Sequence, residues 1–268
     1  SFGALPVEAE YAEIDLPALS LKNSQAGVRL SKSLAGWELS ASYFTGYDMM
    51  PVMTIPTELT IELTDPDALQ TEIRSKVTAQ PELKRLQVFG ADFSTTLGGF
   101  TVRGEGAYFK GKSYVRTIES IYAEVMTTRL QQQIMEEFLN TYYATGKTRQ
   151  TFFMSPPITL TYDSLKYGLG IDYVRGDTTI SVQIIEERVL DYDGTKPIFF
   201  IHNGYDTMLS LAYKQFFLQN TLELNLAGVY DYTFKHYLFQ PSLVYSFSDA
   251  VKGTLGAAVI AGKDPTSL

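Results

Sequence analysis

Hydrophobic and polar residues alternate along much of the chain, most clearly between Thr221 and Phe247. Up to Phe234 the even-numbered positions are largely apolar, and after Lys235-His236 the odd-numbered positions are. Because successive side chains of a β-strand point to opposite faces, this pattern predicts two long strands joined at Lys235-His236. The apolar face is aliphatic in its middle and aromatic at its ends. Strands of about 10 residues with that arrangement are typical of strands that cross a membrane.

The same alternation recurs along the chain and predicts about ten strands. Turn residues such as Ala35-Gly36, Gly98-Gly99 and Gly176-Asp177 separate neighbouring strands. The expected strands lie near residues 25–31, 37–48, 85–94, 100–108, 165–173, 180–187, 209–214, 221–234, 237–247 and 251–259.

Three stretches depart from this pattern. Residues 1–23 carry acidic residues and prolines and are expected to form an irregular lead-in. Residues 49–82 contain four prolines, with a short strand expected at Glu58 to Thr64. Residues 110–161 change to helical spacing, which predicts a helix from Thr117 to Tyr143, broken near Thr127-Thr128 and ended by Gly146. This helix is expected either within an extracellular loop or folded into a lumen.

The lengths of the connections support a membrane fold. Short connections, beginning with 32–36 and 95–99, alternate with longer ones at 49–84, 110–161 and 189–206. Outer-membrane barrels alternate short periplasmic turns with longer outside loops. The predicted fold class is therefore all-β, a transmembrane antiparallel β-barrel, with residues 1–268 as a single domain and 110–161 as a long extracellular loop. About ten strands leave two edges, so a barrel of twelve or more strands, incomplete here at one or both ends, is expected.

Composition narrows the class of protein further. Aromatic residues make up 13% of the chain and cysteine is absent, which suits a membrane wall with aromatic belts and no disulfides. A mean hydropathy of −0.05 is compatible with this, because a barrel averages a polar lumen and an apolar exterior. A net charge of −8 argues against a nucleic-acid partner. No run of about 18 apolar residues is present, so no transmembrane helix is predicted. Any signal peptide is expected to have been removed or to lie upstream.

Two phrases carry a resemblance to known proteins: LSASYFTGYDMMP at 39–51 and FGADFSTTLGGFTVRGEGAYF at 89–109. The hairpins resemble those of Gram-negative outer-membrane porins, and the two phrases are similar to an uncharacterised family of large proteobacterial porin-like barrels. The resemblance covers most of residues 25–262 and implies a bacterial outer-membrane location, with lipid around the wall. Its motifs are wall patterns, so it implies no functional residue.

Charged residues on the polar side of the predicted strands are the candidates for lining a lumen. They are Arg29, Glu38, Arg103, Glu105, Lys166, Asp172, Lys214, Glu223, Asp231 and Lys252, with Asp92 and Glu187 on the same side. Neither sign of charge dominates. They could form a ladder of salt bridges that fills the lumen or holds a plug, or a pore constriction that selects ions by charge.

The sequence offers little for catalysis or metal binding. The only two histidines, His202 and His236, fall in expected outside loops, and no Gly-x-Ser-x-Gly motif is present. The run Asp191 to Gly194 lacks the remaining ligands of a calcium loop. No enzymatic activity, cofactor or metal is therefore expected.

Two function classes remain open from the sequence. The first is a porin-like channel for passive passage of small hydrophilic solutes or ions, in which the inward charges meet solute. The second is a structural barrel that encloses or anchors another protein in its lumen or at its outer loops. The solute and the oligomeric state are not specified by these patterns.

Overall fold

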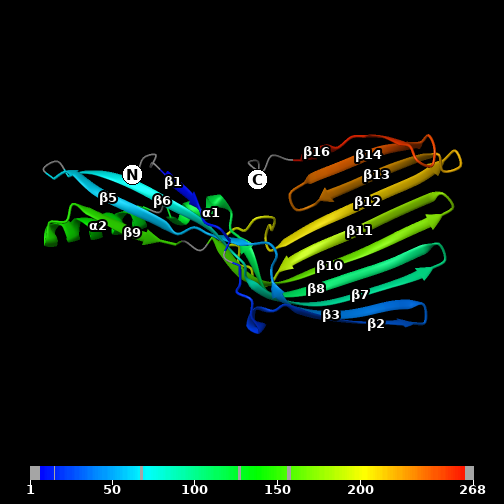
Figure 1. The fold of residues 1–268 in the computed structure, drawn as a ribbon, viewed down its shortest axis with the longest axis horizontal. Coiled ribbons are helices and arrows are strands. Elements are labelled where there is room, and N and C mark those ends of the chain that lie inside the picture. The colour runs from blue at the N-terminus through cyan, green and yellow to red at the C-terminus, as the bar shows by residue number, and fades with distance from the viewer. Residues whose placement is uncertain (1–6, 15, 67–68, 126–127, 156–157, 263–268) are drawn as a thin grey trace.

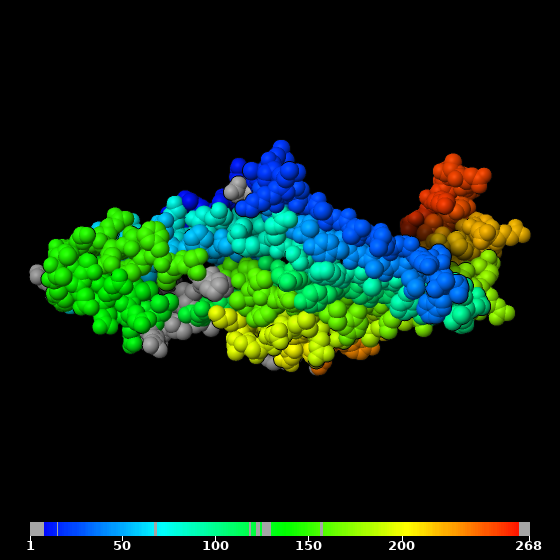
Figure 2. Space-filling view, turned by 90° about the horizontal axis from the view of Figure 1, so that it is seen from below, coloured from blue at the N-terminus to red at the C-terminus, as the bar shows by residue number. Residues whose placement is uncertain are grey.

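The computed structural model describes residues 7–14, 16–66, 69–125, 128–155 and 158–262. The molecule is elongated, with a large antiparallel sheet at one end and a smaller sheet with helices at the other (Figure 1). A second view, turned by 90°, also shows an elongated molecule (Figure 2). The end of the large sheet that carries its short hairpin turns is here called the turn end, and the end next to the smaller sheet is called the loop end.

The large sheet contains all ten expected strands, the last of them divided in two. Its spatial order is β15-β14-β13-β12-β11-β10-β8-β7-β3-β2, with β16 also pairing with β14, and every pairing is antiparallel. The strands are β2 (Ala26–Leu34), β3 (Trp37–Tyr47), β7 (Arg85–Leu97), β8 (Phe100–Val115), β10 (Thr159–Arg175), β11 (Thr178–Val189), β12 (Tyr205–Phe217), β13 (Leu222–Asp231), β14 (His236–Ser246), β15 (Lys252–Gly256) and β16 (Val259–Gly262).

The turns explain why neighbours in sequence become neighbours in the sheet. Ala35 and Gly36 both adopt positive φ, as a two-residue hairpin turn requires. At the tip of the β13–β14 hairpin the prediction was wrong by a few residues. Asp231 pairs with His236, so the turn is formed by residues 232–235, and Asp231 Oδ1 accepts hydrogen bonds from the backbone N–H groups of Thr233 and Phe234. An aspartate that caps its own turn ends the strand earlier than the alternation suggested.

The division of the last strand has a local cause in the neighbouring strand. Ser242 pairs with Gly256 and Phe239 with Val259, so β15 and β16 keep one register along β14. Between them Pro241 accepts a hydrogen bond from Ala257 N at 3.1 Å but has no N–H to return one. The ladder is therefore interrupted at that point.

The smaller sheet is formed by the segments that were expected to be connections. Its order is β1-β6-β5-β9, with β4 also pairing with β6. Together with two helices it forms a body here called the small sheet unit: β1 (Val7–Tyr11), β4 (Val52–Thr54), β5 (Thr57–Asp65), β6 (Gln70–Glu82), α1 (Ile118–Val125), α2 (Thr128–Thr145) and β9 (Arg149–Met154).

Several local predictions can be compared with this unit. The short strand at 58–64 is confirmed within β5, and helical structure is confirmed in α1 and α2. The predicted break near 127–128 borders residues 126–127, which lie outside the described residues. Gly146 follows α2 with a φ of 72°, and its N–H donates to Tyr142 O at 2.7 Å. The prediction of an irregular lead-in was wrong in two places. β1 pairs in parallel with β6, and Leu21–Asn23 forms a short 3-10 turn. Neither described helix combines the length and apolar character needed to cross a membrane.

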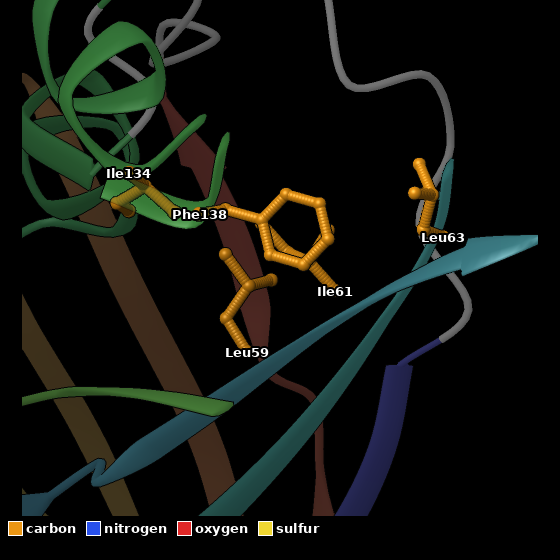
Figure 3. Close-up of a cluster of buried hydrophobic side chains, with 5 residues drawn as sticks. All are labelled: Leu59, Ile61, Leu63, Ile134 and Phe138. Carbon is orange, nitrogen blue, oxygen red and sulfur yellow. The ribbon is translucent and has the colours of Figure 1, made fainter. Parts of the chain in front are cut away.

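The small sheet unit has its own hydrophobic core (Figure 3). Leu59, Ile61 and Leu63 alternate along β5 and so share one face, onto which Ile134 and Phe138 project from successive turns of α2. The side chains of Ile61 and Phe138 are 0% exposed. The helix therefore packs against β5 beyond the loop end of the large sheet, and the alternative that placed it in a lumen is wrong.

A buried arginine links α1 to the end of β8. Arg116 follows β8, is 2% exposed, and pairs with Glu124 of α1 at 2.6 Å. Its guanidinium also donates to Ser120 Oγ and Ser120 O, each at 3.0 Å. A buried charge is tolerated when it is paired and hydrogen-bonded in this way. These contacts hold α1 close to the end of β8.

Candidate functional site: the charged face of the large sheet

The two faces of the large sheet differ sharply in chemistry. On one face, aromatic pairs form a row near the turn end, Trp37 with Phe93 at 5.8 Å and Phe100 with Tyr173 at 4.7 Å between ring centroids. A second row near the loop end joins Tyr43, Phe89 and Tyr108, and Tyr167, Tyr230 and Tyr237 lie on the same face of later strands. Phe100 and Tyr108 are separated by about 26 Å along their strand. We call this the apolar face and the rows its two belts.

Between the belts the apolar face is aliphatic and uncovered. Leu169 and Ile171 are 55% and 50% exposed, and Leu211 is 51% exposed. No other element of the described chain packs on them. In a barrel of the outer-membrane type this is the face that lipid covers, with aromatic belts at the two interfaces.

All ten candidate lumen residues lie together on the opposite face. Residues that pair across neighbouring strands point to the same face of a sheet. The pairings, such as Arg29 with Ser42, Lys166 with Glu187, and Met208 with Asp231, therefore trace one face from strand to strand. We call this the charged face, and its candidate residues are Arg29, Glu38, Arg103, Glu105, Lys166, Asp172, Lys214, Glu223, Asp231 and Lys252. Whether that face lines a lumen stays a prediction.

The structure brings most of the basic candidates into ion pairs. Arg103 Nη1 lies 2.7 Å from Asp172, and Lys214 Nζ lies 2.9 Å from Glu223. Arg29 contacts both carboxylate oxygens of Asp92, at 3.0 and 3.1 Å, and the hydroxyl of Ser40 donates to the same carboxylate. Within the described chain, Glu38, Glu105, Asp231 and Lys252 make no ion pair; Glu38 accepts from Ser94 Oγ at 3.3 Å.

Glycines let the long side chains lie flat on this face. A Cβ at Gly170 would approach Arg103 Nε to 2.9 Å, so the absence of a side chain there allows the guanidinium to run along the wall to Asp172. Gly168 similarly faces Glu105 Oε1, which is 3.6 Å from where its Cβ would lie. A shallow hollow beside these strands is lined by Glu105 and Lys166, among others. Because these charged side chains lie along the sheet, they leave the space in front of it open.

At the loop end, Glu187 is the centre of a polar group. Its carboxylate accepts from Lys112 Nζ at 2.6 Å and from Tyr114 Oη at 2.7 Å, and Lys166 Nζ lies 3.7 Å away. Glu187 and Lys166 lie level with the belt formed by Tyr108 and Tyr167, and Lys112 and Tyr114 lie beyond it. Burial raises the pKa of the Tyr114 hydroxyl.

Sequence reasoning placed Glu187 and Lys166 on this face but missed Lys112 and Tyr114. Strict alternation from Arg103 and Glu105 would put odd-numbered residues of β8 on the charged face and Lys112 on the other. Gly111, with a φ of 77°, lies at a bulge where the register to β10 shifts. One extra residue reverses the facing of everything after it. The glycine within the strand is the signal that could have indicated this.

The structure places both histidines beside the ends of strands. His202 lies in a turn closed by reciprocal backbone bonds with Tyr205, and His236 begins β14 opposite Asp231. His236 is therefore in a strand, not in the tip where it was predicted. Among the described residues no cluster of three histidine or acidic side chains could hold a metal ion.

Comparison with protein families adds the following. A family model matches residues 9–260, which is nearly the whole chain. The chain belongs to the family DUF1302. That family is described only as proteins of unknown function. For this DUF1302 protein, the membership confirms the resemblance to an uncharacterised family, and the large antiparallel sheet confirms the all-β fold class.

Other comparisons give this DUF1302 chain little more. No curated protein is significantly similar in sequence. Among solved structures, the toluene transporter TodX of Pseudomonas putida is 10% identical, with 87% of this chain and 76% of that chain covered and a TM-score of 0.28. A TM-score this low is insufficient to indicate a shared function.

Proposed function

We propose that this DUF1302 chain forms the wall of a bacterial outer-membrane channel that passes small hydrophilic solutes or ions without catalysis. The observation that carries this proposal is the opposition of two faces on one sheet, an uncovered aliphatic band between aromatic belts and a continuous charged face. Large exposed apolar areas are unfavourable in water, and contact with lipid removes that penalty. The charged face then requires water or solute in front of it.

The arrangement of charge favours cations over anions. Arg103, Lys166 and Lys214 are held by carboxylates, whereas Glu38, Glu105 and Asp231 keep carboxylates that no ion pair of the described chain neutralises. Charges in a confined space with low-dielectric walls act strongly on passing ions. The channel is therefore expected to prefer cations moderately.

Conductance of reconstituted protein in planar bilayers tests this proposal. Glu105→Gln is expected to lower the cation-to-anion permeability ratio by about twofold, because an unpaired carboxylate is lost. Asp172→Asn should lower it further, because Arg103 also loses the carboxylate 2.7 Å away. The matched control is Glu119→Gln in α1, which removes the same charge from the small sheet unit and should leave the ratio unchanged. Equal effects at Glu105 and Glu119 would contradict the assignment of the charged face.

Orientation in the membrane gives a second test. The chain has no cysteine, so single cysteines can be introduced at exposed positions without background. Gln133→Cys in α2 is expected to react with a membrane-impermeant maleimide on intact cells, because the long loops of such barrels lie outside. Asp177→Cys, in a short turn, should react only after the outer membrane is permeabilised. Equal labelling of both positions in intact cells would overturn the membrane assignment.

A second function is favoured by one observation. The small sheet unit has its own core and projects beyond the loop end of the large sheet, where it offers surface to another protein (Figure 1). A barrel that encloses or anchors a protein partner would use such a unit. A correctly folded barrel that shows no conductance would favour this second function over the channel.

A further inference from the structure

The segment 190–204 connects β11 to β12 and folds back over the charged face at the loop end. Ile198 and Ile201 of this segment are buried with Val189 and Tyr114 in one hydrophobic cluster. Val189 lies two residues from Glu187, and Tyr114 lies two residues from Lys112, so both side chains project from the charged face. The segment therefore lies in front of that face, unlike α2 and β9, which pack with β5 in the small sheet unit.

The segment is held at its ends and in its middle. Val189 N donates to Gly204 O at 2.8 Å, closing its base. Thr117 N donates to Pro197 O at 2.8 Å, and Phe199 N donates to Val115 O at 2.9 Å, which ties the middle to the end of β8. Tyr192 meets Tyr162 edge to face at 5.7 Å between ring centroids. These contacts fix the segment in place over the sheet.

Charged groups lie directly beneath it. The Glu187 group, with Lys112 and Lys166, is adjacent to the buried cluster through the Tyr114 hydroxyl. Asp206 pairs with Glu187 across the strands and adds a further carboxyl group to this side of the sheet. A solute that moves along the charged face past the loop end meets this group and the segment together.

We propose that segment 190–204 is the constriction of the channel, with the Glu187 group as the charge that an ion passes there. This inference rests on the proposed channel function. It gives this role to 190–204 and not to the helix within 110–161, which packs against β5. An ion at this point is confined between the fixed apolar segment and the charged face, and it is partly dehydrated there. Added side-chain volume or altered charge at such a point has the largest effect on conductance.

Single-channel recordings with introduced cysteines test this inference. Thr195 and His202 are exposed positions of the segment. Thr195→Cys or His202→Cys, once modified by a bulky methanethiosulfonate reagent, is expected to reduce conductance by about half or more. Asn140→Cys in α2 is the matched control and should show no change on modification. The natural chain has no cysteine, so the natural protein treated with the same reagent is a second control.

A shortened segment gives the complementary result. Replacing residues 192–202 by a short Gly-Ser link is expected to raise conductance by about twofold and to admit larger neutral polymers. If this variant does not fold, the cysteine modification decides alone. If the natural protein conducts and neither change alters its conductance, the constriction proposal is wrong but the channel proposal is not. No conductance in the natural, folded protein would overturn both.

Discussion

Arginine in place of Leu211 is expected to prevent most of the protein from folding in a membrane. Leu211 pairs with Val182 and Gly228 midway between the two belts, and its side chain is 51% exposed on the apolar face. A charge at that depth costs about 2 to 4 kcal/mol in a transmembrane barrel, because lipid cannot solvate it. The folded fraction, measured by urea titration in lipid vesicles, should fall accordingly.

The neighbouring residue provides the control for this prediction. Ser210 precedes Leu211 on the same strand and lies on the charged face, where it pairs with Gln183. Ser210→Arg should therefore fold nearly as well as the natural protein, since water or polar groups can solvate the new side chain. Similar losses at 210 and 211 would show that the two faces have been assigned wrongly, and the channel proposal would fall with them.

Alanine in place of Phe138 is expected to unfold the small sheet unit while the large sheet persists. Phe138 is 0% exposed and packs with Ile61 and Leu59 at the centre of that core (Figure 3). Truncating a fully buried phenylalanine costs about 3 to 5 kcal/mol, through lost burial and the cavity left behind. A small core has little stability to spare, so α2 and β5 should lose their protection against hydrogen exchange.

This prediction also has a neighbouring control. Glu137 precedes Phe138 on α2 and is exposed, so Glu137→Ala should leave hydrogen exchange in β5 unchanged. The strands β11 to β13 of the large sheet report on the rest of the molecule in the same experiment. Loss of protection there together with α2 would mean that the two sheets unfold as one unit.

Much of the large sheet could be predicted from local sequence, for a physical reason. Alternation with period two follows from strand geometry, so it places Leu211 and Ser210 on opposite faces before any pairing is known. Short turns are specified by residues that tolerate positive φ, such as Gly36. Hairpins join strands that are adjacent in sequence, and so the order of the strands and the common face of the ten charged candidates followed from the same pattern.

The tertiary structure decided what pairs over long distances. The helix 128–145 could be predicted from its spacing, but its packing against β5 could not. Likewise, nothing within residues 57–65 or 149–154 specifies that these two segments pair in one sheet. The ion pair of Arg103 with Asp172 depends on the register of two strands and on the space above Gly170. The bulge at Gly111 reversed the facing of Lys112, and packing alone brought segment 190–204 over Glu187. Sequence thus determined which faces exist, while register and burial determined which side chains meet on them.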